Sequence, residues 1–109
     1  MYYLRDQQTK ENTLTIARLL LKEQYPFISP IQRHEVAFIL GQLDPLSNQS
    51  EIRSILEILI LDETEYSVSR HESIIAYGSI YQDTEATNFL KFISESSCPL
   101  VSESAKIYL

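Results

Sequence analysis

Apolar residues recur along this chain with the spacing of helices that bury one face. In the segment 13–23 they return every three or four residues, as an amphipathic helix requires. The same periodicity predicts further helices over residues 31–43, 50–61, 68–80, 84–94 and 100–109. Prolines and polar runs separate these segments, and glycine is scarce. The pattern therefore predicts an all-α protein, in which Asn12 and Ser50 are expected to be N-caps.

One frame of residues occurs twice in the chain. The stretches RHEVAFILG and RHESIIAYG contain both histidines, His34 and His71, which lie 37 residues apart. The last predicted helix enters the same frame with Glu103 in the histidine position. Repeats of about this length, made of two helices, are typical of an α-solenoid. We expect residues 1–109 to form one HEAT-repeat domain of about three helix pairs, with the end of a preceding helix at 1–6.

Composition narrows the classes of partner and compartment. The 109 residues include 15 acidic and 9 basic side chains, which gives a net charge of −6. No basic cluster is present, so a nucleic acid is not an expected partner, whereas a cationic partner is favoured. The absence of a long apolar run argues against a membrane span. A single cysteine, Cys98, cannot form an internal disulfide, which fits a reducing compartment and a cytoplasmic location.

The repeated His-Glu pairs are the candidate chemistry. Equivalent residues of stacked repeats project from helices about 8–10 Å apart, so His34 and His71 are expected to share one face, next to Glu35 and Glu72. Two imidazoles and a carboxylate with open coordination positions form the ligand set of non-haem iron oxygenases, and zinc also accepts it. The alternative interpretation is that the repeated frame is only a duplicated structural unit and carries no site. The apolar residues inside it have diverged while His and Glu have not, which favours a site.

The other residues of the frame have structural interpretations. Gly41 and Gly78 each lie seven residues after a histidine, on nearly the same helical stripe. Because a mid-helix glycine costs about 1 kcal/mol relative to alanine, its repetition indicates close approach by a neighbouring helix or a ligand. The arginines, Arg33 and Arg70, are expected to pair with acidic residues of the turns. Four aromatic residues are expected in the core: Phe38, Tyr77, Phe89 and Phe92.

The runs RHEVAFILGQL, VSRHESIIAYGSI and PLVSESAKIYL resemble deoxyhypusine hydroxylase, a HEAT-repeat di-iron monooxygenase. The resemblance implies hydroxylation of the deoxyhypusine residue of translation initiation factor 5A to hypusine. It implies Fe(II) as cofactor, a di-iron centre in the complete enzyme, and dioxygen as co-substrate. It also implies that His34, His71 and Glu72 are metal ligands. Glu35 is implied to be a ligand or an acceptor for the substrate amine, so that Glu35 and Glu72 are the candidate catalytic residues.

The family carries four His-Glu motifs in two similar halves, and this chain has two motifs. It resembles the C-terminal half more closely, which implies either a missing second half or a homodimer that rebuilds the pair of halves. The isolated chain is then expected to be weak or inactive unless it dimerises. The alternative is a non-catalytic HEAT-repeat interaction module that keeps the motifs as structure. A mononuclear zinc or iron site with unrelated chemistry is a third interpretation.

Overall fold

The computed structural model describes residues 9–109, and the helix end expected at residues 1–6 lies outside them. Throughout the described part of the chain the regular structure is helical, which confirms the all-α prediction. The elements, in chain order, are α2 (Lys10–Ala17), the 3₁₀ helix η1 (Arg18–Leu20), α3 (Pro30–Gln42), α4 (Ser50–Leu61), α5 (Ser67–Ile80), α6 (Thr84–Ile93) and α7 (Pro99–Lys106).

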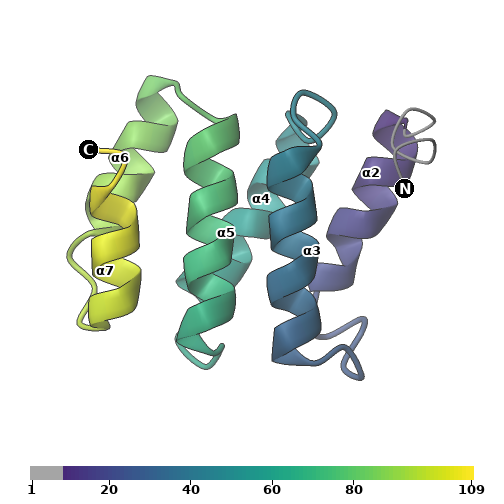
Figure 1. Ribbon diagram of the computed structural model, residues 1–109, viewed down its shortest axis with the longest axis horizontal. Coiled ribbons are helices and arrows are strands. Elements are labelled where there is room, and N and C mark those ends of the chain that lie inside the picture. The colour runs from purple at the N-terminus through teal and green to yellow at the C-terminus, as the bar shows by residue number, and fades with distance from the viewer. Residues whose placement is uncertain (1–8) are drawn as a thin grey trace.

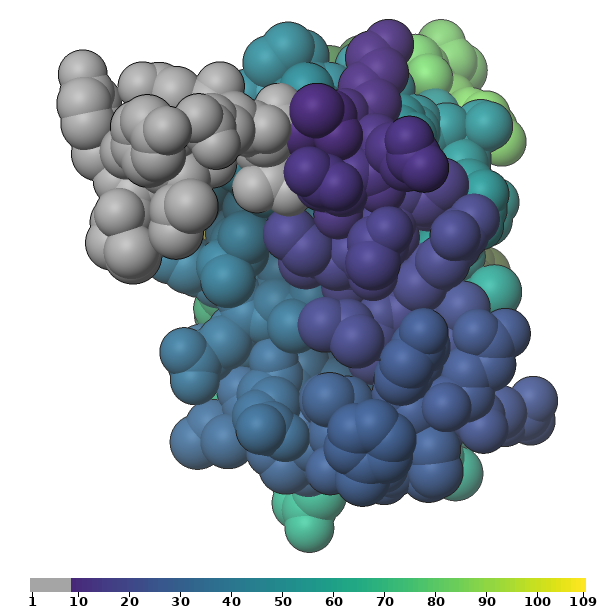
Figure 2. Space-filling view, turned by 90° about the vertical axis from the view of Figure 1, so that its right-hand side faces the viewer, coloured from purple at the N-terminus to yellow at the C-terminus, as the bar shows by residue number. Residues whose placement is uncertain are grey.

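The helices form two layers (Figure 1). One layer contains α2, α4 and α6, and the other contains α3, α5 and α7. Each helix of the first layer packs on the next helix in the chain, and α5 packs against both α3 and α7. Figure 2 shows the end of this stack that is formed by α2 and the segment leading to α3. The arrangement is three stacked helix pairs, as in HEAT-like folds.

Two helix starts differ from the sequence-based expectation. Helix α2 begins earlier than expected because Thr9 is its N-cap, and the Thr9 side chain accepts a hydrogen bond from the backbone N–H of Asn12 at 3.1 Å. Asn12 is therefore inside the helix. Ser50 is the first residue of α4 rather than its cap, and Gln49 in the cap position makes no capping side-chain hydrogen bond. Burial of the apolar face of α4 compensates for the missing cap.

The core lies between the two layers, with Tyr77 of α5 near its centre. Tyr77 is fully buried, and its hydroxyl donates to the Glu57 carboxylate at 2.6 Å. The Arg53 guanidinium lies over the Tyr77 ring, 5.6 Å from the ring centroid. Phe89 packs partly buried against this core, as expected. The expectation was wrong for Phe38 and Phe92, which are exposed because they lie on the outward faces of α3 and α6.

Candidate functional site

Local sequence fixes where α3 presents its His-Glu pair. Ser29 caps the helix through a capping box with Gln32, and Pro30 occupies the first helical position. The Ser29 hydroxyl accepts from the Gln32 N–H at 3.2 Å, and the Gln32 side chain accepts from the Ser29 N–H at 2.8 Å. This defined start places His34 and Glu35 in the second turn, on the layer formed by α3, α5 and α7.

The arginine before each histidine is turned into the stack. The buried Arg33 side chain donates from Nε and Nη2 to the two oxygens of Glu65, at 2.5 and 2.7 Å. This confirms the expected pairing with an acidic turn residue for Arg33. For Arg70 that pairing was wrong, because its Nε donates to the backbone carbonyl of Ile60 at 2.8 Å. Successive helical residues point about 100° apart, so an inward arginine leaves the next residue, histidine, near the surface.

The first histidine meets the glutamate of the next repeat. His34 Nε2 lies 3.2 Å from Glu72 Oε2, which joins α3 to α5. The side chains are partly buried, with exposed fractions of 32% for His34 and 15% for Glu72. His34 Nδ1 is buried and has no hydrogen-bond partner in the described structure. An imidazole and a carboxylate from two in-register motifs are thus brought together at one point.

The second histidine makes the equivalent contact with a different partner. His71 Nδ1 lies 2.5 Å from the hydroxyl oxygen of Ser104 on α7. In the repeated frame Glu103 corresponds to His71, so the next residue, Ser104, corresponds to Glu72. The register proposed for the last helix is therefore confirmed, with serine in place of the carboxylate. Ser104 is the contact that sequence reasoning missed, although the position of Glu103 in the frame could have indicated it.

The four predicted site residues are only partly gathered. His34 and Glu72 are in contact, His71 is hydrogen-bonded to Ser104, and Glu35 is exposed on α3. The two imidazoles therefore have different partners instead of one shared point. Within residues 9–109, no three His, Cys, Asp or Glu side chains lie close enough together to hold a metal ion. The structure thus supplies a two-donor pair and leaves the full ligand set a prediction.

The two repeated glycines differ in how closely the next repeat approaches them. A Cβ built at Gly41 would lie 3.5 Å from the Cα and Cβ atoms of Ala76 on α5. A Cβ built at Gly78 would overlap the ring of Tyr108, which follows α7. Of the two causes expected for these glycines, the structure shows the neighbouring segment of the next repeat for Gly78. At Gly41 the contact distance is an ordinary one, so the approach of α3 to α5 does not require a glycine there.

A network of charges lies near the turn that precedes α5. Lys22 Nζ lies 2.9 Å from Asp62 Oδ2 and 3.5 Å from Glu65 Oε1. Burial alone would raise the pKa of Asp62, but hydrogen bonds from Thr64 and Lys22 outweigh it and lower the pKa to about 2. Burial likewise opposes ionisation of Glu65, and its contact with Arg33 reverses this and lowers its pKa. The network joins the segment after η1, the start of α3 and the turn before α5.

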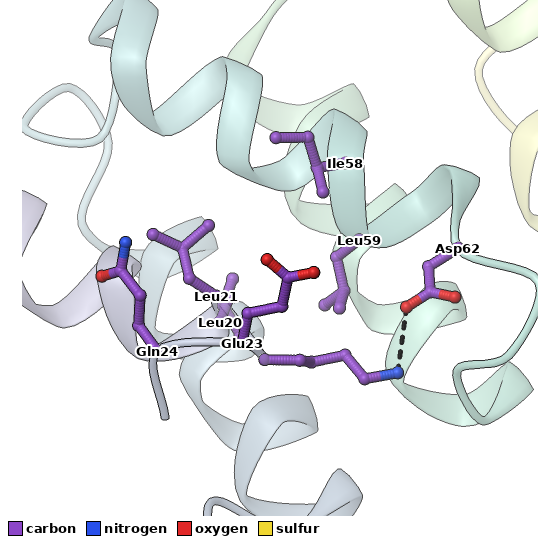
Figure 3. Close-up of a pocket in the computed structure, with 8 residues that line it drawn as sticks. Leu20, Leu21, Glu23, Gln24, Ile58, Leu59 and Asp62 are labelled. Atoms are coloured by element: carbon purple, nitrogen blue, oxygen red, sulfur yellow. Dashed lines mark hydrogen bonds and ion pairs between the residues drawn. The ribbon is translucent and has the colours of Figure 1, made fainter. Parts of the chain in front are cut away.

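A hollow of about 300 Å³ lies on the side of the molecule formed by α2, α4 and α6 (Figure 3). It lies between the segment after η1 and the last turns of α4, and is lined by Leu21, Glu23, Ile58 and Leu59 among others. The Lys22–Asp62 ion pair closes one side of it. None of the four predicted site residues lines this hollow.

The fold and the paired motifs define the class of protein. It is an all-α stack of HEAT-like helix pairs, in which His34 of one pair contacts Glu72 of the next. Comparison with known proteins gives the family that it resembles. The chain is 32% identical over all 109 residues to deoxyhypusine hydroxylase of Candida albicans, covering 31% of that protein. It is 34% identical over the same length to deoxyhypusine hydroxylase of Drosophila melanogaster, covering 33% of it.

A rice relative, deoxyhypusine hydroxylase-B of Oryza sativa subsp. japonica, is 33% identical over 81 residues, which is 74% of this chain and 25% of that protein. The chain thus spans about a third or less of the length of the curated relatives it matches. No protein-family model matches it, and no solved structure matches it. The resemblance to deoxyhypusine hydroxylase is confirmed. Among the described helices, none is both long and apolar enough to cross a membrane.

Proposed function

We propose that this chain is part of a deoxyhypusine hydroxylase, which uses iron and dioxygen to convert the deoxyhypusine residue of translation initiation factor 5A to hypusine. The contact between His34 and Glu72 carries the proposal. It joins two in-register motifs of a kind that a plain helical scaffold does not require. Similarity to named hydroxylases over the whole chain supports the same conclusion.

The residues present fit part of an iron site. His34 Nε2 and Glu72 Oε2 lie 3.2 Å apart, and an imidazole nitrogen and a carboxylate oxygen are donors that Fe(II) accepts. His34 and Glu72 would hold the ion. His71, Glu35, or the second half or copy of the protein would complete the ligand set. When bound, iron supplies the redox chemistry that activates dioxygen.

The chain's own residues supply orientation and charge. Glu35 is exposed one residue beyond His34, on the same layer as the His34–Glu72 pair. An exposed carboxylate there would bind the ammonium group of a long amine-bearing side chain. The net charge of −6 would also attract a cationic substrate. We further propose a cytoplasmic location, in keeping with the substrate.

Hydroxylation of the proposed substrate tests this function. Deoxyhypusine-bearing factor 5A would be incubated with iron-loaded protein and dioxygen, and its mass gain of one oxygen atom followed. We expect turnover to rise with the fraction of dimer, or on addition of the missing half, because residues 9–109 of one copy gather only two donors. His34→Ala should abolish turnover, whereas the exposed Gln42→Ala on the same helix should not change it. Equal turnover by His34→Ala would contradict the assignment.

A second candidate function is a non-catalytic interaction module. It is favoured by the hydrogen bond between His71 and Ser104, which gives one of the two histidines a structural role. On this account the chain binds no iron, and replacing either histidine with alanine changes stability modestly. Metal analysis of the purified protein distinguishes the two candidates, and it separates iron from zinc.

A further inference from the structure

We propose that a hollow beside Arg70, at one end of the stack, binds a small-molecule monocarboxylate with an apolar body. The hollow has a volume of about 390 Å³ and is lined by the end of α4, the turn before α5, and the segment that joins α6 to α7. The turns before α5 and before α7 lie at the same end of the stack (Figure 1). None of the four His-Glu residues lines this hollow, so the inference is independent of the proposed function.

The guanidinium of Arg70 has hydrogen-bond donors that the described part of the chain does not use. The Arg70 residue is only 7% exposed, and its Nε donates to the backbone carbonyl of Ile60 at 2.8 Å. Within residues 9–109 this is the one hydrogen bond that its side chain donates, and Arg70 forms no ion pair there. Because Arg70 lines the hollow, its two Nη groups are available to a molecule bound inside it.

The preceding repeat shows which group pairs with an arginine at this position. There Arg33 donates from Nε and Nη2 to the two oxygens of Glu65. In the register that aligns His71 with Glu103, Glu65 aligns with Ser97, which also lines the hollow. A serine hydroxyl at this position supplies no carboxylate to Arg70. A ligand carboxylate would take its place, since carboxylates are the acceptors that match the fork of an arginine.

The walls of the hollow determine what the carboxylate is attached to. Leu61 and Phe92 line it with exposed fractions of 47% and 65%, and the buried Ile93 lies between the two turns of chain that enclose it. A hollow of this volume is within the range of about 300–1,000 Å³ that is typical of small-molecule sites. An apolar body would cover Leu61 and Phe92 and remove their side chains from water.

Two carboxylates at the hollow limit the charge that the ligand can carry. Glu63 and Glu95 are exposed and line it. They repel a dianion more strongly than a singly charged ion, because the repulsion is proportional to the charge of the ligand. A monocarboxylate is therefore favoured over phosphate as the partner of Arg70.

Isocaproate is the probe, because it joins one carboxylate to a branched aliphatic body. Its binding would be followed by NMR chemical-shift titration of the isotope-labelled chain, in EDTA and in a buffer free of phosphate and other carboxylates. Isocaproamide has the same shape without the charge, and acetate has the charge without the apolar body. We expect saturable shifts at Glu63 and Ser97 with isocaproate, and at least tenfold weaker binding of isocaproamide, acetate and phosphate.

Either of two results of this titration would overturn the proposal. One is equal binding of isocaproate and isocaproamide, which would show that the Arg70 guanidinium does not select a carboxylate. The other is the absence of a saturable shift with isocaproate. Because the buffer contains no metal, neither result would affect the hydroxylase assignment.

Substitution of Ser97 tests the site from within the chain. Ser97→Glu restores the carboxylate that Glu65 supplies to Arg33, so it should compete with the ligand and weaken isocaproate binding at least tenfold. Ser97→Gln is the matched control, because it adds a side chain of the same size without a charge, and it should bind isocaproate within twofold of the wild type. Ser97 is exposed, and circular dichroism would verify that both variants are folded. Wild-type affinity in Ser97→Glu, or an equal loss in both variants, would overturn the proposal.

Discussion

At the scale of single residues, the buried pair of Arg33 and Glu65 connects one repeat to the next. Both side chains are almost fully buried, and two hydrogen bonds join them. The pair connects the start of α3 to the turn before α5, so it sets the position of one His-Glu motif relative to the next. Removing one partner of such a pair leaves a buried charge uncompensated.

We therefore expect Glu65→Gln to lower the free energy of unfolding by about 3–5 kcal/mol. Urea denaturation followed by circular dichroism would measure this. Glu63→Gln, in the same turn but exposed, is the matched control and should change stability by less than about 0.5 kcal/mol. Similar effects of the two substitutions would show that the buried pair does not hold the repeats together.

The same network predicts how stability depends on pH. The folded-state pKa of Asp62 is about 2, below its ordinary value near 3.8, and that of Glu65 is also lowered. Because both pKa values are lowered on folding, these carboxylates stabilise the fold above about pH 4, and the contribution is lost as the pH falls towards 2. Denaturation midpoints measured from pH 5 to about pH 2 should fall steeply, and less steeply in Asp62→Asn. Equal slopes would exclude Asp62 as a cause.

At the scale of helices, periodicity predicted most of the fold. Apolar spacing gave five of the six described α-helices within three residues of their ends, because each buries a single stripe against the other layer. The helix expected over residues 13–23 instead ends at Ala17 and is followed by the 3₁₀ helix η1. Capping was predicted less well, since asparagine is by residue type a better N-cap than threonine and yet Thr9 caps α2. The contact between His71 and Ser104 was not predicted, although placing Glu103 in the histidine position of the frame puts Ser104 in the position that Glu72 has in the preceding repeat.

The two glycines provide a prediction about helix packing. At Gly41 an added Cβ meets Ala76 at an ordinary contact distance, so Gly41→Ala should gain up to about 1 kcal/mol from helix propensity. At Gly78 an added Cβ overlaps the Tyr108 ring, and such overpacking costs about 1–3 kcal/mol. Gly78→Ala should therefore be the less stable variant in thermal unfolding.

The Tyr108→Ala background is the control for this pair. With the ring removed, Gly78→Ala should no longer destabilise and should behave as Gly41→Ala does. If Gly78→Ala destabilises equally with and without the ring, the close approach of Tyr108 is not what requires a glycine at this position.

At the scale of the whole molecule, the incomplete ligand set links metal binding to assembly. The described part of one copy gathers two donors, His34 and Glu72, which is fewer than a catalytic iron or zinc site needs. The curated relatives are about three times as long as this chain, so their sites have further residues available. A ligand set completed by a second copy or by a second half of the protein is consistent with the two gathered donors and with the greater length of the relatives.

Iron should accordingly promote self-association. We expect sedimentation velocity to show a dimer when Fe(II) is added under anaerobic conditions, and a monomer after EDTA. Glu72→Ala should remain monomeric in both conditions, because it removes one of the two gathered donors. A wild-type chain that stays monomeric while it binds iron would contradict completion of the site by a second copy.

The most direct test of the central claim is the iron content of anaerobically purified protein, measured by elemental analysis together with the matched variants. The account predicts stoichiometric iron in the wild-type chain and in Gln42→Ala, and its loss in His34→Ala and Glu72→Ala. A wild-type chain that takes up no iron even in excess Fe(II), or His34→Ala and Glu72→Ala variants that retain it, would contradict the account.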